Sequence, residues 1–234
     1  MQREEVEALF DQHAASYDQQ WTKLAPMREA LHLLISSVLG DLPSTARVLC
    51  VGAGTGSEVL YLARQFPDWQ FTVLEPSAEM MAVCKRRTEE QGIASRCEYH
   101  TGYLETLPPE RRFDAATSLL VSQFMLDQEE RSGFFREIAD RLRPGGYLFN
   151  ADLSAVQGST EYQRQLAVWL RMLTQADVPQ ERVDQLAQMY ARDVGILPPA
   201  TVGTIITAGG FEPPVPIFQG GLIHAWFTTL ASSR

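Results

Sequence analysis

The feature that most constrains this chain is a run of alternate glycines between a strand-like and a helix-like segment. Arg47–Val51 is a continuous β-favouring run, Gly52, Gly54 and Gly56 follow it, and Glu58–Phe66 has apolar residues at helical spacing. A strand that passes through bare glycine backbone into a helix turns tightly and lets a ligand approach the main chain. Such a turn is typical of doubly wound α/β folds.

The same alternation of strands and helices continues through the central half of the chain. Strand-like runs occur at Phe71–Leu74, Phe113–Thr117 and Tyr147–Phe149, with His100 at the end of another, and amphipathic helix-length segments at Ser77–Gln91 and Asp127–Leu142. Asp127 with Glu130 three residues later is a variant of the capping box, and Pro144-Gly145-Gly146 cannot continue a helix. Continuous apolar strands separated by helices predict a parallel sheet covered on both faces.

The flanking segments complete the predicted architecture. Further helical segments are expected at Arg3–Ser16, Pro26–Leu39, Glu161–Gln175 and Gln180–Val194, and from Pro198-Pro199 to Gly209-Gly210. Val215–Gln219 and Leu222–Leu230 around Gly220-Gly221 form a hairpin signature. We therefore expect a doubly wound α/β fold with a mostly parallel seven-stranded sheet, a terminal antiparallel hairpin and a helical insertion before the sixth strand. The expected single domain divides into a helical cap (1–45), a cofactor-binding core (46–153), an inserted lid (154–197), and a last helix with the hairpin (198–234).

Composition excludes several classes of protein. The net charge of −9 arises mainly in residues 1–153, with 23 acidic and 15 basic side chains. Nucleic-acid binding is disfavoured, since it requires clustered Lys and Arg, and Lys85–Arg87 is expected to be a solvated helix face. The three cysteines have no CxxC spacing, which disfavours disulfides and zinc and indicates a reducing compartment. The longest apolar stretches fall short of the ~20 residues of a membrane span. We expect a cytoplasmic protein with no metal site.

An acid placed after the second strand-like run indicates the type of ligand. Glu75 lies 23 positions after Gly52, where doubly wound sheets hold an acid that accepts ribose hydroxyls. The glycine spacing is GxGxG and not the dinucleotide GxGxxG, because Ser57 replaces the last glycine. Glu58 would also place a carboxylate close to a pyrophosphate, and like charges repel. The sequence therefore predicts an adenosine-containing ligand without phosphates.

These motifs resemble those of the S-adenosylmethionine (SAM)-dependent methyltransferases with a Rossmann-like fold. Val48–Gly56 is similar to the first motif of that family, Leu74–Ser77 with Met80 to the second, and Leu142–Gly146 to the turn before the fifth strand. The resemblance implies SAM as cofactor and S-adenosylhomocysteine as product. It also implies cofactor contacts from the two glycine-containing loops, the second motif and the loop after the fourth strand: Gly52, Ala53, Gly54, Gly56, Glu75, Pro76, Met80, Gly102, Tyr103, Leu104, Leu119 and Leu120.

The resemblance does not extend to the residue that is expected to contact the adenine. The family commonly has an acid after the glycine of the third-strand loop, whereas this chain has Tyr103. Either the Tyr103 ring stacks on the adenine or Glu105 reaches it. At the N-terminus, Phe10-Asp11 with Tyr17-Asp18 is similar to an element that closes over the sulfonium in small-molecule methyltransferases. A cation beside an aromatic face gains about 0.5–2 kcal/mol, so Tyr17 is a candidate neighbour of the sulfur. The alternative is that Tyr17 packs the end of the first helix.

Methyl transfer from a sulfonium is an in-line displacement, in which the protein chiefly aligns donor and acceptor. A general base is needed only where the acceptor must lose a proton. Asp152, which follows the fifth strand-like run, is the candidate for that role. The alternative is that Asp152 caps a turn toward the insertion.

The insertion is expected to determine the acceptor. One helical face carries Tyr162, Leu166, Trp169, Leu170 and Leu173, and the opposite side is also apolar, with Val168 and Met172. Such a helix is buried on both sides. We expect one face to pack on the sheet and the other, with Met189 and Tyr190, to roof a pocket for a small apolar or aromatic acceptor. Ordinary core packing and a homodimer interface are the alternatives.

Three other functions remain open. Ser122–Phe124 and Phe218–Gly220 are similar to the branch of the family that contains carboxy-SAM synthase, although the neighbours of Arg192 do not match the arginine motif of that branch. An NAD-dependent oxidoreductase would use the same glycine turn. A non-catalytic SAM-binding protein would keep the glycines and lack an acceptor pocket.

Overall fold

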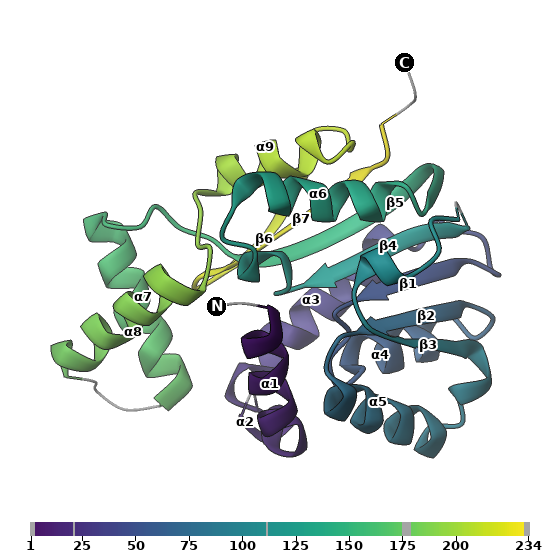
Figure 1. Cartoon of the computed structure of the whole chain (residues 1–234), viewed down its shortest axis with the longest axis horizontal. Coiled ribbons are helices and arrows are strands. Elements are labelled where there is room, and N and C mark those ends of the chain that lie inside the picture. Colours follow the sequence, from purple (N-terminus) through teal and green to yellow (C-terminus); the bar gives the residue numbers. More distant parts are fainter. Residues whose placement is uncertain (1–2, 21, 111, 175–178, 232–234) are drawn as a thin grey trace.

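The computed structural model describes residues 3–20, 22–110, 112–174 and 179–231, and the strands within them form one seven-stranded sheet (Figure 1). The strand order is β3-β2-β1-β4-β5-β7-β6. β7 pairs antiparallel with both β5 and β6, so the other strands share one direction. The strands are β1 (Arg47–Val51), β2 (Gln70–Glu75), β3 (Cys97–Thr101), β4 (Phe113–Leu119), β5 (Leu142–Leu153), β6 (Val215–Gly220) and β7 (Ile223–Thr229). The predicted parallel sheet with a terminal hairpin is confirmed.

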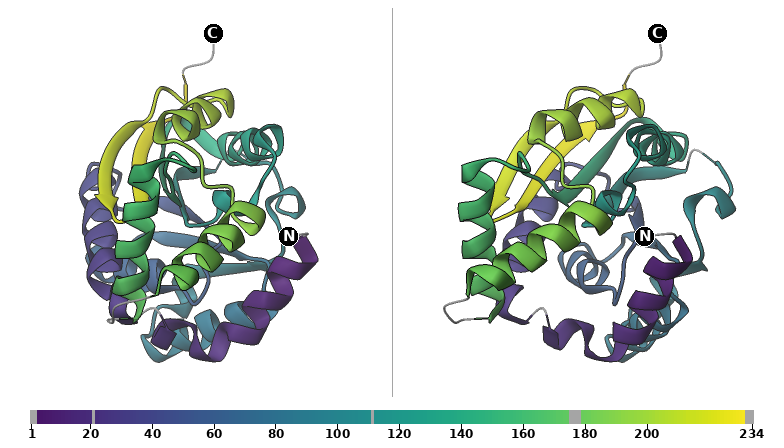
Figure 2. Two further views of the ribbon diagram at one scale, coloured as in Figure 1. Left: turned by 90° about the vertical axis from the view of Figure 1, so that its left-hand side faces the viewer. Right: turned by 60° about the vertical axis from the view of Figure 1, so that its left-hand side comes forward.

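Helices cover both faces of this sheet. They are α1 (Arg3–His13), α2 (Tyr17–Gln20), α3 (Ala25–Val38), α4 (Ser57–Gln65), α5 (Ala78–Glu90), α6 (Gln128–Ala139), α7 (Thr160–Thr174), α8 (Gln180–Asp193) and α9 (Pro199–Ala208). Side chains alternate along β1, so that Val48 and Cys50 pack into one buried cluster with α3, α4, α5 and α7. Leu49 and Val51 pack into a second cluster with α6 and α9. Figure 2 shows α7 beside the β6–β7 hairpin.

Two helix starts follow their sequence signals. The Ser77 side chain accepts a hydrogen bond from Met80 N at 3.1 Å, and the Asp127 side chain accepts one from Glu130 N at 2.9 Å. These bonds satisfy backbone donors that have no partner within the first helical turn. They fix where α5 and α6 begin, beside the carboxyl ends of β2 and β4.

Some predicted boundaries were wrong. α6 ends at Ala139 and not at Leu142, because Arg141 and Leu142 already pair with the start of β4 and Leu142 is fully buried there. Pro144-Gly145-Gly146 therefore lies within β5, at a shift of the β4–β5 register. The predicted helix over 161–175 is observed to Thr174, and Gln175 lies outside the described residues.

Within the described part of the chain, no helix combines the length and apolarity needed to cross a membrane. The same residues contain no group of three or more His, Cys, Asp or Glu side chains arranged to hold a metal ion.

Candidate active site

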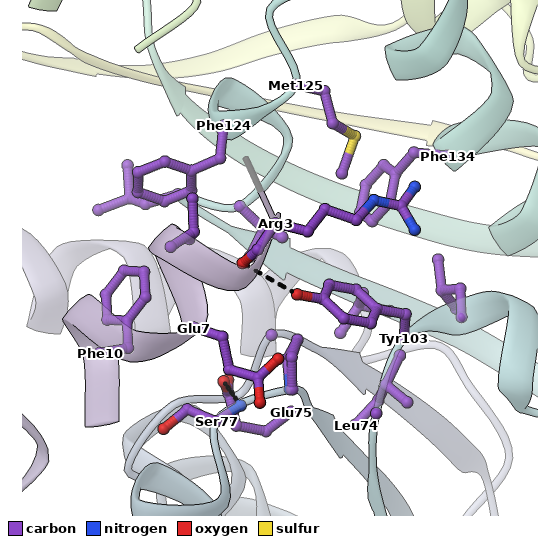
Figure 3. Close-up of a pocket in the computed structure, with 18 of the residues that line it drawn as sticks. Arg3, Glu7, Phe10, Leu74, Glu75, Ser77, Tyr103, Phe124, Met125 and Phe134 are labelled. Carbon is purple, nitrogen blue, oxygen red and sulfur yellow. Dashed lines mark hydrogen bonds between the residues drawn. The ribbon is translucent and has the colours of Figure 1, made fainter. Parts of the chain in front are cut away.

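A cavity of about 680 Å³ opens at the carboxyl ends of β1, β2 and β4, beneath α1 (Figure 3). The sheet order changes direction between β1 and β4, which is where open α/β sheets bind ligands. Most of the predicted site residues line this cavity: Tyr17, Gly52, Gly54, Glu75, Pro76, Met80, Gly102, Tyr103, Leu104, Leu119 and Leu120. Ala53, Gly56 and Asp152 are not part of its lining.

The glycine turn forms one wall of the cavity. Gly52 has φ +64°, and a Cβ there would lie 2.5 Å from a Val121 methyl group, so no other residue fits without rearrangement. Gly54 has φ +55°, and a Cβ there would meet no protein atom within 4 Å. The space beside Gly54 is therefore open to a ligand.

Glu75 lies at the base of the cavity, at the end of β2. Its carboxylate accepts hydrogen bonds from Gly54 N at 2.8 Å and Ser77 N at 3.0 Å, and the residue is 7% exposed. Burial raises the pKa of Glu75 despite these two bonds. Burial, followed by the charge of Glu75, raises the pKa of Tyr17 to about 12. The cavity therefore has a buried acceptor group beside exposed main chain.

Three aromatic side chains, Phe10, Tyr17 and Phe124, form a cluster that we call the aromatic trio. The ring centroids of Phe10 and Tyr17 lie 6.1 Å apart, and those of Phe10 and Phe124 lie 5.6 Å apart, both in edge-on arrangements. Figure 3 shows Phe10 and Phe124 on one side of the cavity and Tyr103 on the other. All three members of the trio line the cavity, so a cation there would meet aromatic surface.

The N-terminal residues 3–20 and 22–24, here called the N-terminal cover, close the cavity from above. Arg3 pairs with Glu105 at 2.5 Å and Glu130 at 3.2 Å, and its guanidinium lies 5.1 Å from the centre of the Tyr103 ring. Tyr103 Oη in turn donates to the Arg3 carbonyl at 3.3 Å. Glu105, one of two candidates for the adenine contact, is thus engaged by the cover.

Aspartates attach the rest of the cover. The Asp11 carboxylate accepts from Ser77 Oγ at 2.5 Å and Glu79 N at 3.2 Å. The Asp18 carboxylate accepts from Arg87 at 2.7 Å and from Thr55 Oγ1 at 2.9 Å. The prediction that Arg87 belongs to a solvated face was therefore wrong, because Arg87 joins α5 to the glycine turn and to α2.

Asp152 is fully buried away from the cavity. Arg131 lies 3.0 Å from its carboxylate, and Ser122 Oγ donates to it at 2.6 Å. Gln123 N and Asn150 Nδ2 donate to the same carboxylate at 3.0 Å and 2.7 Å. This position corrects the hypothesis of a general base at Asp152, since a ligand in the cavity does not reach that carboxylate. The alternative, that Asp152 caps a turn toward the insertion, is not observed either, because the turn that Asp152 caps follows β4.

Glu58 also lies outside the cavity. Thr117 Oγ1 donates a hydrogen bond to the Glu58 carboxylate at 2.7 Å, and burial raises the pKa of Glu58 to about 7. The expectation that this carboxylate would repel a pyrophosphate was therefore wrong. Among the arguments against a dinucleotide, only the missing third glycine remains.

The insertion is placed differently from the predicted lid. Tyr162, Leu166, Trp169 and Leu170 are buried as expected, and Trp169 packs against Gly221 of the hairpin turn. Val168 and Met189, however, are 44% and 42% exposed, and no described residue of 154–197 lines the cavity. Met172 and Tyr190, in contrast, pack into the core: Met172 lies beside Gly221, and the Tyr190 hydroxyl accepts a hydrogen bond from Trp169 Nε1 at 2.9 Å. The insertion thus packs against the hairpin and not above the strand ends, and only part of its second apolar side faces outward.

The resemblance predicted an N-terminal element with Phe10 and Tyr17 that closes over the ligand, and both residues line the cavity. Two further parts of the lining were not predicted. One is the start of the cover, which contributes Arg3, Val6 and Glu7, and the other is the start of α6, which contributes Asp127, Glu130, Gly133, Phe134, Arg136 and Glu137. The position of α6 directly after the β4 loop was the available signal, whereas no spacing in the sequence indicates that Arg3, Val6 and Glu7 face the cavity.

Comparisons with known proteins agree with this fold. Residues 48–146 match the family model described as a methyltransferase domain. A fatty-acid O-methyltransferase of Mycolicibacterium smegmatis is 34% identical over 131 residues, which cover 55% of this chain and 45% of that protein. Phthiotriol/phenolphthiotriol dimycocerosates methyltransferase 1 of Mycobacterium ulcerans is 32% identical over 142 residues, covering 60% of this chain and 50% of the relative. The chain thus spans about half the length of these curated relatives.

Solved structures show the same architecture. The crystal structure described as that of a putative O-methyltransferase from Nostoc punctiforme aligns with a TM-score of 0.68 at 15% identity, over 94% of this chain and 59% of that one. Fold and cavity together define a doubly wound α/β protein with a cavity at the point where the strand order changes direction. The match to the methyltransferase domain covers residues 48–146, which contain the glycine turn and Glu75, and the chain is similar over this part to proteins named as methyltransferases.

Proposed function

We propose that this protein transfers a methyl group from SAM to a small apolar or aromatic acceptor. The observation that carries the proposal is a single cavity that combines three surfaces. These are a buried carboxylate at Glu75, open main chain at Gly54 and the aromatic trio. They match the ribose diol, the amino-acid portion and the sulfonium of SAM, respectively.

The residues at hand fit this cofactor. Glu75 would accept the ribose hydroxyls, and the bare backbone at Gly52 and Gly54 would allow close approach of the amino-acid part. The flat ring of Tyr103, together with Met80, supplies apolar surface for an adenine. Bound SAM would supply an already activated methyl group. The chain's own contribution is to orient donor and acceptor, exclude water and offer aromatic faces to the positive charge.

The acceptor class follows from the remaining lining. Val6, Met125, Leu126 and Phe134 give the lining outside the cofactor surfaces an apolar component, beside the charged residues of α1 and α6 that also line the cavity. Two relatives are named for a fatty acid and for phthiotriol lipids, so long-chain acceptors are the first to test, followed by phenols. In-line displacement needs only alignment when the accepting oxygen is already a carboxylate.

A thermal-shift assay with SAM, S-adenosylhomocysteine and NAD tests the proposal. A ligand at 100 times its dissociation constant stabilises the folded state by about 2.7 kcal/mol, which raises the unfolding midpoint measurably. We expect a shift with SAM and with S-adenosylhomocysteine, and labelled methyl transfer to a fatty acid or a phenol. A shift with NAD alone would establish the oxidoreductase alternative. Binding of SAM without transfer to any acceptor would support a non-catalytic SAM-binding protein.

A further inference from the structure

Beneath the loop that follows β4 lies a buried polar network outside the cavity. Arg131 of α6 and Asp152 of β5 have side chains that are both 0% exposed, and they form an ion pair of 3.0 Å. Ser122 Oγ accepts from Arg131 Nε at 2.8 Å and donates to Asp152 at 2.6 Å. Two charges removed from water in this way are destabilising unless each is satisfied by close partners.

The network also forms hydrogen bonds with the main chain of the loop after β4. Gln123 N donates to Asp152 Oδ1 at 3.0 Å, and the Gln123 side chain accepts from Leu153 N at 2.7 Å. Leu120 N donates to the Ala151 carbonyl at 2.6 Å. Together with the bond from Ser122 Oγ to Asp152, the segment 120–123 is therefore joined to β5 by four hydrogen bonds.

The same loop has a strained backbone and faces the cavity. Leu120 has φ +60° and is the only non-glycine residue with positive φ within the described ranges. Leu119, Leu120 and Val121 line the cavity, and Val121 packs against Gly52 of the glycine turn. Strain of this kind persists only where surrounding contacts impose it. The Ala151 carbonyl holds Leu120 itself, and the buried network holds Ser122 and Gln123 directly after it.

The network also reaches the end of the insertion. Arg131 Nη1 donates to the Gly195 carbonyl at 2.8 Å, and Gly195 N donates to the Gln123 carbonyl at 2.7 Å. The chain leaving α8 is thus fixed to the loop that lines the cavity, although the insertion itself does not line it.

We propose that Arg131 and Asp152 are positioning residues, which hold the strained loop 119–124 in the conformation that shapes the cofactor cavity. This inference rests on the proposed function, because the cavity is taken to bind SAM. The pair touches neither cofactor nor acceptor and acts through Ser122, Gln123 and the loop backbone.

The test separates positioning from stability by removing one charge and then both. Arg131→Met leaves Asp152 buried and uncompensated, so its unfolding midpoint should fall strongly. The double variant Arg131→Met/Asp152→Leu removes both charges and should regain most of that midpoint. Its affinity for S-adenosylhomocysteine, measured by calorimetry, should still fall about tenfold or more, because displacing a lining group by a fraction of an ångström is enough to weaken binding. The amides of residues 119–124 should exchange hydrogen faster in the ligand-free double variant.

Phe135→Ala is the matched control. Phe135 lies one turn further along α6, fully buried in the other apolar cluster and outside the cavity lining. This variant should lose stability and keep the wild-type affinity within about twofold.

Wild-type affinity and wild-type exchange in the double variant would overturn the inference. If the double variant does not fold, Ser122→Ala is tested in its place, because it removes only the bridging hydroxyl. A loss of about threefold in affinity for S-adenosylhomocysteine, with faster amide exchange in residues 119–124, supports positioning. No change in either quantity overturns it. If S-adenosylhomocysteine does not bind to the wild type, the proposed function is contradicted. Amide hydrogen exchange in the ligand-free proteins would still test whether the network holds the loop.

Discussion

The two sides of the cavity are held by different forces. On the sheet side, the glycine turn and the loop after β4 rest on residues that water does not reach, such as Arg131 and Asp152 at 0% exposure. On the opposite side, α1 has no buried residue, and Arg3 and Glu105 are 48% and 54% exposed. Buried contacts resist salt, whereas partly exposed ion pairs are screened by it. The sheet side is therefore the more firmly supported wall, and we expect the N-terminal cover to be the side that opens for ligand exchange.

The largest expected effect is on the sheet side, at Gly52. Gly52→Ala would combine left-handed strain with the 2.5 Å clash against Val121, and should lower the free energy of unfolding. Together these terms amount to about 4 kcal/mol. Chemical denaturation of the variant measures the loss.

Two glycines serve as controls for that variant. Gly92 has φ +69° with no atom within 4 Å of a Cβ, so Gly92→Ala should show the strain alone, about 1 kcal/mol. Gly54→Ala should lose a similar amount and also lose S-adenosylhomocysteine binding, because its Cβ enters the cavity. Equal losses in the free energy of unfolding for Gly52→Ala and Gly92→Ala would show that a Cβ at position 52 does not clash with Val121.

The second effect is a pH dependence of the sheet side. Burial raises the pKa of Glu58 from 4.5 to about 7, so the folded state holds a proton that the unfolded state releases between these values. Stability therefore falls as the pH rises from 4.5 to 7, and Glu58→Gln should remove that slope. The stability of Glu58→Gln relative to the wild type should increase by about 3 kcal/mol across this range. A difference that stays constant with pH would show that Glu58 is ionised in the folded protein throughout.

The smallest effect belongs to the cover. Arg3→Ala removes two half-exposed ion pairs, so the free energy of unfolding should change by less than about 1 kcal/mol. S-adenosylhomocysteine should nevertheless dissociate a few times faster in stopped-flow measurements, and added salt should reproduce this in the wild type.

Arg86→Ala is the matched control for the cover. Arg86 pairs with Glu90 at 3.8 Å, with both side chains 63% exposed and outside the cavity lining. Its substitution should leave the dissociation rate unchanged. A stability loss for Arg3→Ala as large as that of Gly52→Ala would show that the cover is part of the core.

The same contrast explains what the sequence predicts and what it does not. Strand β1, the glycine turn and Glu75 are each recognisable from a short stretch of sequence. The structure has all three at the predicted positions. The roles of Asp152 and Glu58 were wrong because nothing in the local sequence shows toward which neighbours a side chain turns from its strand or helix, β5 for Asp152 and α4 for Glu58. The cover and the orientation of α7 depend on contacts between residues far apart in sequence, such as Arg3 with Glu105 and Trp169 with Gly221.

Calorimetric titration of S-adenosylhomocysteine into the wild type and into Glu75→Ala tests the central claim most directly. Hydrogen bonds to a charged group contribute about 1.5–3 kcal/mol each, so two ribose hydroxyls correspond to a loss of roughly a hundredfold or more in affinity. We expect one ligand per chain for the wild type and that loss of affinity for Glu75→Ala, measured under conditions in which both proteins are folded. No binding to the wild type, or equal affinity in the two proteins, would contradict this claim.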